Sequence, residues 1–204
     1  FSLEWARIEP EEGVFDKEEL EHYRQVLQAL RTRGIEPFVT LWHFTLPQWL
    51  ADKGGFDNKQ TPELFARYAG KVVESFSDLA IFYSTLNEPN VYATHGYLYG
   101  AWPPFKRLKV GWRRLGKEDG TSEKTAAVAT FSNLFAYRRV ERNLVKAHIA
   151  AYKRIKSVAP QAQVSVVKHV HYFDSVDKCF EAVRSKYDKI YGTHLSDTTK
   201  VLYD

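Results

Sequence analysis

The sequence predicts an α/β fold of the (β/α)8 barrel type, with only about half of the barrel present. Short apolar segments alternate with helical patterns in the order β-α-β-α-β-α-β, which is typical of parallel strands joined by right-handed crossovers. Polar side chains also gather at the ends of the predicted strands, where a barrel carries its chemistry. These residues are Arg7, His43, Asn87, Glu88 and His169.

The competing architecture is a doubly wound sheet that binds a nucleotide. Such a sheet usually has a glycine-rich loop after its first strand, and here the first strand runs into Glu9 and Pro10. The barrel therefore explains the clustering better. A complete barrel has eight strands and typically about 250 residues, whereas four strands are readable in these 204 residues. We therefore expect residues 1–204 to be a single partial domain.

The first three elements follow from local patterns. Residues 1–8 alternate apolar and polar side chains, which predicts a short strand. Residues 17–33 carry apolar side chains three and four apart, which predicts an amphipathic helix with Asp16 as its N-cap and Gly34 at its end. Residues 37–42 are apolar without alternation, as expected of a strand that is buried on both faces.

The later elements continue the alternation. A helix begins near Thr61, where an N-cap residue is followed by proline and glutamate. Residues 79–86 predict the third strand, residues 89–123 a long polar loop, residues 126–158 a long helix and residues 163–170 the fourth strand. The side chains expected to face inward from the long helix are Phe131, Leu134, Phe135, Val140, Leu144, Val145, Ile149 and Tyr152.

The composition indicates a globular protein. Hydrophobic residues make up 44% and charged residues 26% of the chain, and no apolar run approaches the roughly 18 residues of a membrane helix. Much of the net charge of +4 comes from the basic segment 106–117. We favour a solvated loop over a nucleic-acid patch, because no recognition helix or stacking motif accompanies this segment.

Other features concern the compartment and the chain ends. Cys179 is the only cysteine, so the chain has no internal disulfide, which favours a reducing compartment and a cytoplasmic location. The chain contains no methionine and begins inside a predicted strand, so we expect its native beginning to be missing. Residues 176–191 are expected to form one helix.

The chemistry centres on Asn87 and Glu88, which follow a buried strand and precede a proline. A glycosidic oxygen leaves poorly unless it is protonated, and a carboxyl in an aromatic pocket near a second carboxylate stays protonated near neutral pH. Glu88 therefore suits a general acid, and Asn87 can donate to a sugar hydroxyl. His43 and its aromatic neighbours Trp42 and Phe44 can bind the sugar ring from the adjacent strand, and Arg7 can hold a nucleophilic carboxylate ionised.

Each of these residues also has a plainer interpretation. Glu88 can be a loop acid or a helix cap, since an Asn-Glu-Pro run is weak evidence by itself. Arg7 can form a structural ion pair with Glu4 or Glu9. His43 can be a satisfied core histidine.

No metal or cofactor is expected. His169 and His171 alternate on the last predicted strand, but no tight cluster of histidine and cysteine accompanies them, which disfavours a metal role. The 5 tryptophans, 12 tyrosines and 13 phenylalanines give a weak hint of sugar binding, because aromatic faces stack on the apolar faces of sugar rings. A well-filled core explains them equally.

Several stretches together resemble glycoside hydrolase family 1. In order, residues 1–10 resemble that family's second strand, 40–50 its third strand and loop, 85–89 its acid/base motif, 96–104 the following loop and 142–148 its fourth helix. The match covers residues 1 to about 173, roughly strands 2 to 5 of the barrel, and leaves residues 174–204 unclear. Each motif alone is unspecific, but their order and spacing make the set specific.

The resemblance implies roles for single residues. This family contains retaining β-glycosidases, so Glu88 is expected to be the acid/base, and Asn87 to contact the hydroxyl beside the reacting carbon. His43 is expected to bind a hydroxyl further round the ring, and Phe44 stands where the family usually has an aromatic residue. Arg7 matches the arginine that holds the nucleophile.

The chain also departs from the family pattern. The family's nucleophile lies in a late Thr-Glu-Asn-Gly motif, which this sequence lacks. A retaining reaction needs two carboxyls about 5–5.5 Å apart, so we expect the whole protein to hydrolyse β-glucosides or related β-glycosides and this chain alone to be inactive. The alternatives are a carbohydrate-binding pseudoenzyme and a barrel fragment that assembles with the missing half or with a second copy.

Overall fold

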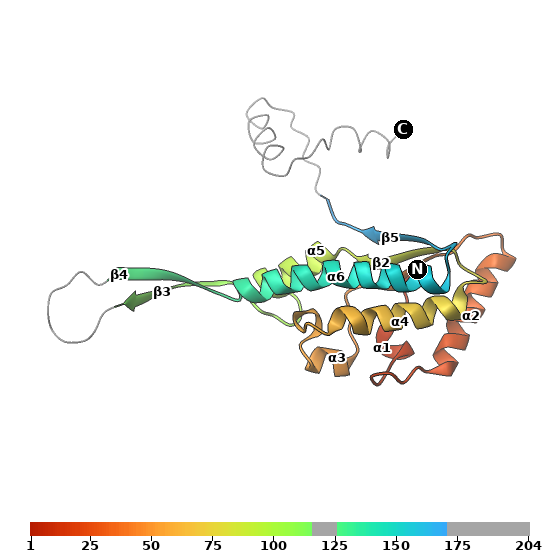
Figure 1. Ribbon diagram of the computed structural model, residues 1–204, viewed down its shortest axis with the longest axis horizontal. Coiled ribbons are helices and arrows are strands. Elements are labelled where there is room, and N and C mark those ends of the chain that lie inside the picture. Colours follow the sequence, from red (N-terminus) through yellow and green to blue (C-terminus); the bar gives the residue numbers. More distant parts are fainter. Residues whose placement is uncertain (116–125, 171–204) are drawn as a thin grey trace, which may run out of the picture. The chain divides into compact units, whose positions relative to one another are not determined.

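The computed structural model describes residues 1–115 and 126–170, in which a parallel sheet of three strands forms the centre (Figure 1). The strands are β1 (Phe38–Trp42), β2 (Phe82–Asn87) and β5 (Gln163–Val167), in the spatial order β1-β2-β5. Residues 1–169 form one unit. The helix expected over residues 176–191, and Cys179 within it, lie outside the described residues.

The register brings the carboxyl ends of the strands together at one edge of the sheet. Trp42 lies opposite Leu86 in the β1–β2 ladder, and Asn87 lies opposite Val167 in the β2–β5 ladder, where the register shifts between Ser84 and Asn87. Each crossover moves one strand further in the same direction. Right-handed crossovers that all advance one way place their helices on the same face of the sheet.

The helices follow this arrangement. The long ones are α2 (Lys17–Thr32), α4 (Thr61–Phe76) and α6 (Leu134–Val158), and α4 packs along α6 while contacting α2 on its other side (Figure 1). Shorter elements are α1 (Trp5–Ile8), α3 (Gln48–Asp52), the 3-10 turn η1 (Gly55–Asp57), α5 (Pro89–Ala93) and the π-turn η2 (Thr94–Leu98).

The predicted helices α2 and α4 and the strands β1, β2 and β5 are confirmed, with ends shifted by up to three residues. Asp16 caps α2, where its Oδ1 accepts from the amides of Glu18 and Glu19 at 2.8 and 3.1 Å. Gly34 follows the helix with φ of +71°, a conformation that costs glycine little.

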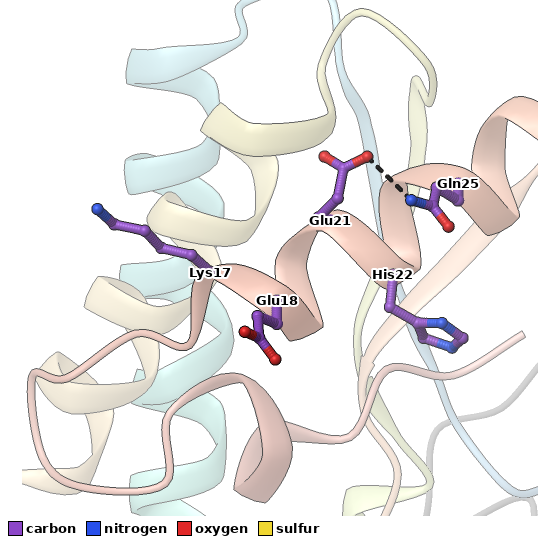
Figure 2. A pocket seen from close by; sticks show the side chains of 5 residues that line it. All are labelled: Lys17, Glu18, Glu21, His22 and Gln25. Carbon is purple, nitrogen blue, oxygen red and sulfur yellow. Dashed lines mark hydrogen bonds between the residues drawn. The ribbon is translucent and has the colours of Figure 1, made fainter.

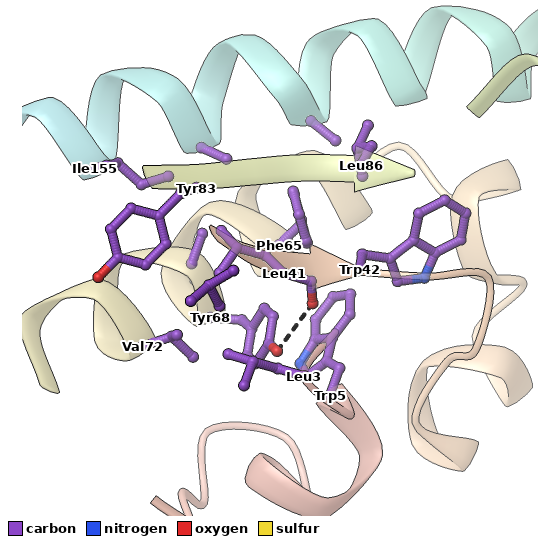
Figure 3. Close-up of a cluster of buried hydrophobic side chains, with 14 of the residues drawn as sticks. Leu3, Trp5, Leu41, Trp42, Phe65, Tyr68, Val72, Tyr83, Leu86 and Ile155 are labelled. Atoms are coloured by element: carbon purple, nitrogen blue, oxygen red, sulfur yellow. Dashed lines mark hydrogen bonds between the residues drawn. The ribbon is translucent and has the colours of Figure 1, made fainter. Parts of the chain in front are cut away.

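A core rich in aromatic side chains lies between the sheet and the helices (Figure 3). Trp5 stacks on Tyr68 with ring centroids 4.8 Å apart, and the Tyr68 hydroxyl donates to the carbonyl of Leu41 at 3.0 Å. The fully buried large side chains are Trp5, Trp42, Tyr68, Tyr83, Tyr97, Phe56, Phe65, Phe76, Ile8, Leu27, Leu41 and Leu50. Aromatic residues therefore fix how α1 and α4 approach β1.

The strand predicted over residues 1–8 is wrong beyond its first residues. Ser2 bridges Thr40 in parallel, and the amide of Leu3 donates to Thr40 at 2.9 Å, but Trp5–Ile8 is one turn of α-helix. Trp5 and Ile8 are three apart and both buried. The apolar pattern that we interpreted as alternation therefore also satisfies a helical turn.

The long loop predicted over residues 89–123 is also wrong. It begins with α5 and η2 and continues into β3 (Lys109–Leu115), which pairs antiparallel with β4 (Ala126–Ser132). The helix expected from residue 126 begins only at Leu134, because residues 126–132 take up ladder bonds with β3 and Asn133 follows with φ of +64°. Pairing with a distant segment outweighs the helical propensity of an alanine-rich stretch.

The inward face predicted for α6 is partly wrong. Val140 and Leu144 are buried as expected, but Phe135, Val145, Ile149 and Tyr152 are exposed. The buried stripe consists of Ala136, Val140, Asn143, Leu144, Ala147, Ala151 and Ile155. The small alanine side chains allow α6 to lie close against its neighbours and leave the larger apolar side chains outside.

Candidate active site

A hydrogen-bonded chain of polar side chains lies at the carboxyl ends of β1 and β2. Asn87 ends β2, and its Nδ2 lies 3.1 Å from Nε2 of His43, which follows β1. Nδ1 of His43 lies 2.8 Å from the hydroxyl of Ser2. Because an amide NH2 only donates, Nε2 accepts and His43 carries its proton on Nδ1, from which it donates to Ser2. The Oδ1 atom of Asn87 has no hydrogen-bond partner among the described residues.

The backbone of Glu88 is held in an unusual conformation. Its φ of +44° is left-handed, which is uncommon for a residue other than glycine. Pro89 follows and disfavours the right-handed helical region for Glu88. The Glu88 carbonyl accepts from the amides of Val91 and Tyr92, so it caps α5, and its amide donates to Val167 of β5 at 2.7 Å. These bonds fix the direction in which its side chain leaves the strand end.

The side chain of Glu88 contacts His169, which lies just after the carboxyl end of β5. Oε1 of Glu88 lies 3.3 Å from Nδ1 of His169, and the two side chains are 29% and 37% exposed. The backbone carbonyl of His169 accepts from Nδ2 of Asn90 at 3.0 Å. The sequence placed His169 at a strand end but gave no sign of this contact, which depends on how β2 and β5 shift in register.

Aromatic rings line the side of the site next to His43. Phe44, with φ of +75°, packs edge-on against His43 at 5.1 Å, against Trp42 at 5.9 Å and against Trp102 at 5.0 Å between centroids. Trp102 comes from the loop after η2, and sequence reasoning did not assign it to the site. Phe44 and Trp102 are half-buried and present apolar surface beside a polar cluster.

Arg7 does not join this cluster. It lies on the helical turn α1, where its guanidinium forms an exposed ion pair with Glu19 of α2. The hydrogen bond and charge of Glu19 raise the pKa of Arg7 above its ordinary value. Neither Glu4 nor Glu9, which were the structural partners considered for Arg7, forms its ion pair among the described residues.

A third histidine, His148 of α6, lies behind the site next to β2. Nδ1 of His148 is 2.7 Å from the Thr85 hydroxyl, three residues before Glu88, and that hydroxyl also donates to the carbonyl of Ser165 at 3.2 Å. Burial lowers the pKa of His148. Its imidazole therefore favours the neutral form and supports β2 without adding charge.

Other surfaces carry less chemistry. A shallow pocket on the first turns of α2 is lined by Lys17, Glu18, Glu21, His22 and Gln25 (Figure 2), and it shares no residue with the strand-end cluster. Within residues 1–115 and 126–170, no three His, Cys, Asp or Glu side chains lie close enough to hold a metal ion. In the same residues, no helix is both long and apolar enough to cross a membrane.

Comparisons with known proteins agree on one family. The sequence model of Glycosyl hydrolase family 1 matches residues 1–196. The chain is 30% identical to Beta-glucosidase A of Thermotoga maritima over 186 residues, which cover 91% of this chain and 36% of that protein. It is 41% identical to Coniferin beta-glucosidase of Pinus contorta over 106 residues, 51% of this chain and 21% of that protein.

Solved structures give the same result. The beta-glucosidase from Thermotoga maritima in complex with noeuromycin superposes with a TM-score of 0.73 at 31% identity, over 90% of this chain and 36% of that one. The same enzyme in complex with castanospermine superposes equally well. This chain therefore spans little more than a third of the length of these relatives.

Proposed function

The chain belongs to glycosyl hydrolase family 1, and on that basis we propose that it is part of a retaining β-glycosidase in which Glu88 is the general acid/base. The relatives are named as β-glucosidases, which supports β-glucosides or related β-glycosides as the substrates. The observation that carries the proposal is the placement of Glu88 beside the hydrogen-bonded pair of Asn87 and His43 at one edge of a parallel sheet.

The reaction has two steps. A carboxylate nucleophile attacks the anomeric carbon, the glycosidic C–O bond breaks, and Glu88 gives its proton to the leaving oxygen. Glu88, now a carboxylate, takes a proton from water while the water oxygen attacks the same carbon and releases the nucleophile. We propose that the nucleophile lies outside these 204 residues, since they contain no Thr-Glu-Asn-Gly motif.

The contact between Asn87 and His43 suits a sugar hydroxyl. A hydroxyl both donates and accepts, so it can enter between the two side chains, donate to Nε2 of His43 and accept from Nδ2 of Asn87. The Ser2 hydroxyl, which can accept from Nδ1–H, is compatible with the His43 tautomer whose Nε2 accepts. Phe44, beside His43, supplies apolar surface on which the sugar ring can pack.

Arg7 keeps its proposed role as the partner of the nucleophile. Its ion pair with Glu19 is exposed, with 57% of the Arg7 side chain accessible. Exposed pairs contribute little to stability, because solvent screens the charges. The Arg7 guanidinium can therefore leave Glu19 and pair with a nucleophilic carboxylate with little loss of free energy.

We propose further that the sheet is about half of a (β/α)8 barrel. The strand order follows the chain order, which supports a singly wound sheet. Within the described residues, no strand pairs with the outer edge of β5, where Val166 and Val167 are exposed. The remaining strands of the barrel, from the same polypeptide or from another copy, would cover this edge.

The test is hydrolysis of a chromogenic β-glucoside by the complete polypeptide that contains this chain. Glu88→Gln should lower kcat by about 10²–10⁴-fold, the usual contribution of general acid–base catalysis. Glu63→Gln is the matched control, because Glu63 is an exposed glutamate in the first turn of α4. Full activity in Glu88→Gln would reject the assignment.

The second candidate is sugar binding without cleavage, which the presence of His43 and Asn87 in a chain without the motif favours. Calorimetry of this chain with glucose tests it. Heat of binding that disappears in a variant with both His43→Ala and Asn87→Ala would support a binding role. Hydrolysis of the chromogenic β-glucoside by residues 1–204 alone, abolished by Glu88→Gln, would contradict a role in binding without cleavage.

A further inference from the structure

We propose that His169 is a positioning residue for Glu88: it holds Oε1 of the carboxyl so that Oε2 faces the leaving oxygen. This inference rests on the proposed function, in which Glu88 exchanges a proton with the substrate. It is motivated by the 3.3 Å contact between Nδ1 of His169 and Oε1 of Glu88.

Three hydrogen bonds tie the end of β2 to the residues that follow β5. The Glu88 amide donates to Val167, the Asn90 side chain donates to the His169 carbonyl, and the His169 ring contacts the Glu88 carboxyl. The first two bonds fix the backbones on both sides. The third therefore joins two side chains whose attachment points are already held in place, which is what a precise catalytic geometry requires.

The chemistry of the contact fits both protonation states of Glu88. When Glu88 is the acid, its proton lies on Oε2 and Oε1 accepts from Nδ1–H of His169. When Glu88 is the base, Oε1 accepts the same bond and Oε2 takes the proton from water. One imidazole tautomer thus serves both steps. Among the described residues Oε2 has no hydrogen-bond partner, which leaves it available to the substrate.

The left-handed backbone of Glu88 strengthens this interpretation. A non-glycine residue at φ of +44° is strained and persists only where its surroundings hold it. Such strain is often found at sites where a side chain must point in a defined direction. The backbone then sets the direction of the Glu88 side chain, and His169 sets the rotation of its carboxyl.

The first test uses this chain with 15N-labelled histidine. Glu88→Gln should shift the Nδ1 resonance of His169, which is identified by its loss in His169→Asn. The resonances of His22, on the exposed face of α2, and of His148, bonded to Thr85, are the controls and should not move. An unmoved His169 resonance would overturn the contact and with it the inference.

The second test is kinetic and uses the complete polypeptide with two substrates, a nitrophenyl β-glucoside and an alkyl β-glucoside. A nitrophenolate leaves without much protonation, whereas an alkoxide depends on the acid. His169→Leu should lower kcat/KM for the alkyl substrate about tenfold more than for the nitrophenyl one, as expected for a lost hydrogen bond to a charged group. His169→Asn, whose amide places a donor near the position of Nδ1, should restore most of the loss.

The outcomes separate the two proposals. If Glu88→Gln lowers kcat/KM equally for both substrates, the proposed acid role fails, because kcat/KM reports the step in which the leaving group departs. If Glu88→Gln shows the leaving-group dependence but His169→Leu slows both substrates equally, His169 is only structural and this inference alone is overturned. If both Glu88→Gln and His169→Leu show the leaving-group dependence, and His169→Asn restores most of the rate, the positioning role of His169 is supported.

Discussion

At the scale of single residues, His148 shows how a buried polar side chain supports the site without touching substrate. Its Nδ1 bonds the Thr85 hydroxyl at 2.7 Å, and Thr85 lies on β2, three residues before Glu88, which follows the strand. The ring is half-buried between β2 and α6. Burial penalises a charge there, so the folded protein favours neutral imidazole.

This arrangement predicts a pH-dependent stability. Burial lowers the pKa of His148 below its ordinary value of 6.5, so below that pH the unfolded chain binds a proton that the folded chain resists. The free energy of unfolding should therefore fall as the pH falls from about 7.5 to about 5. Urea unfolding at several pH values measures the slope, which should be smaller in His148→Gln.

The matched control is His22→Gln, since His22 is exposed on α2. That variant should keep the slope of the unchanged chain. An equal slope in His148→Gln would show that other groups account for the pH dependence.

Much of the site could be predicted from the sequence at this scale. His43, Asn87 and Glu88 follow recognisable strands, and parallel strands bring their ends to one edge. The contacts of Ser2 and His169 could not be predicted, because they depend on a register shift and on side-chain rotamers. Arg7 was placed on a strand, and the helical turn instead directs it to Glu19.

At the scale of elements, the turn α1 is held by a buried carboxylate. Glu9 is fully buried, and it accepts from the indole N–H of Trp5 at 2.8 Å and from the amide of Gly13 at 2.7 Å. It also pairs with Arg67 of α4. The backbone carbonyl of Glu9 accepts from Trp49 at 2.9 Å. One residue therefore joins α1, the following turn, α3 and α4.

Removing this carboxylate should destabilise the fold. Glu9→Ala leaves the buried indole N–H of Trp5 without its acceptor, and an unsatisfied buried group costs about 1–3 kcal/mol. The amide of Gly13 also loses its acceptor, but Gly13 is exposed, so water can replace that bond. Arg67 also loses its partner. Because its side chain is 37% exposed, water can solvate the guanidinium, so this loss destabilises the fold less than the unsatisfied Trp5 donor does. Urea unfolding should show the loss in the free energy of unfolding.

Glu11→Ala is the control for this prediction, since Glu11 is exposed two residues away. It should change stability by no more than about 0.5 kcal/mol. A similar result for Glu9→Ala would mean that the buried carboxylate is dispensable.

The elements that were predicted well have strong local signals. Helix α2 has a cap and regular apolar spacing, and α4 has a proline in its first turn. The hairpin of β3 and β4 lacks such signals, because its partner strands are separated along the chain and one of them is rich in alanine. Short or non-locally paired segments are where sequence patterns fail.

At the scale of the whole molecule, apolar surface remains uncovered on α6. Val145, Ile149 and Tyr152 are 60%, 46% and 43% exposed and follow one another at helical spacing on one face. The sequence indicated that these side chains should be buried, and the described residues do not bury them. In the proposed barrel, further strands and helices would cover this face of α6.

This surface predicts that the isolated chain self-associates. Exposed apolar faces and unpaired strand edges favour association because it removes apolar surface from water and satisfies free backbone groups. Sedimentation velocity over a concentration series should show species larger than the 23.6 kDa monomer. Val145→Glu combined with Ile149→Lys should shift the chain towards monomer, since it replaces the stripe with a helical i,i+4 ion pair and leaves the net charge unchanged.

A matched variant separates this effect from a general change in the helix surface. Gln25→Lys places the same kind of i,i+4 pair with Glu21 on α2, and it should leave association as it is.

If the unchanged chain is monomeric at every concentration, the stripe does not need a partner. If both variants associate like the unchanged chain, the contact lies elsewhere, and the open edge of β5 becomes the surface to block. Loss of association only in the α6 variant would show that this face of α6 carries the contact between copies of the chain.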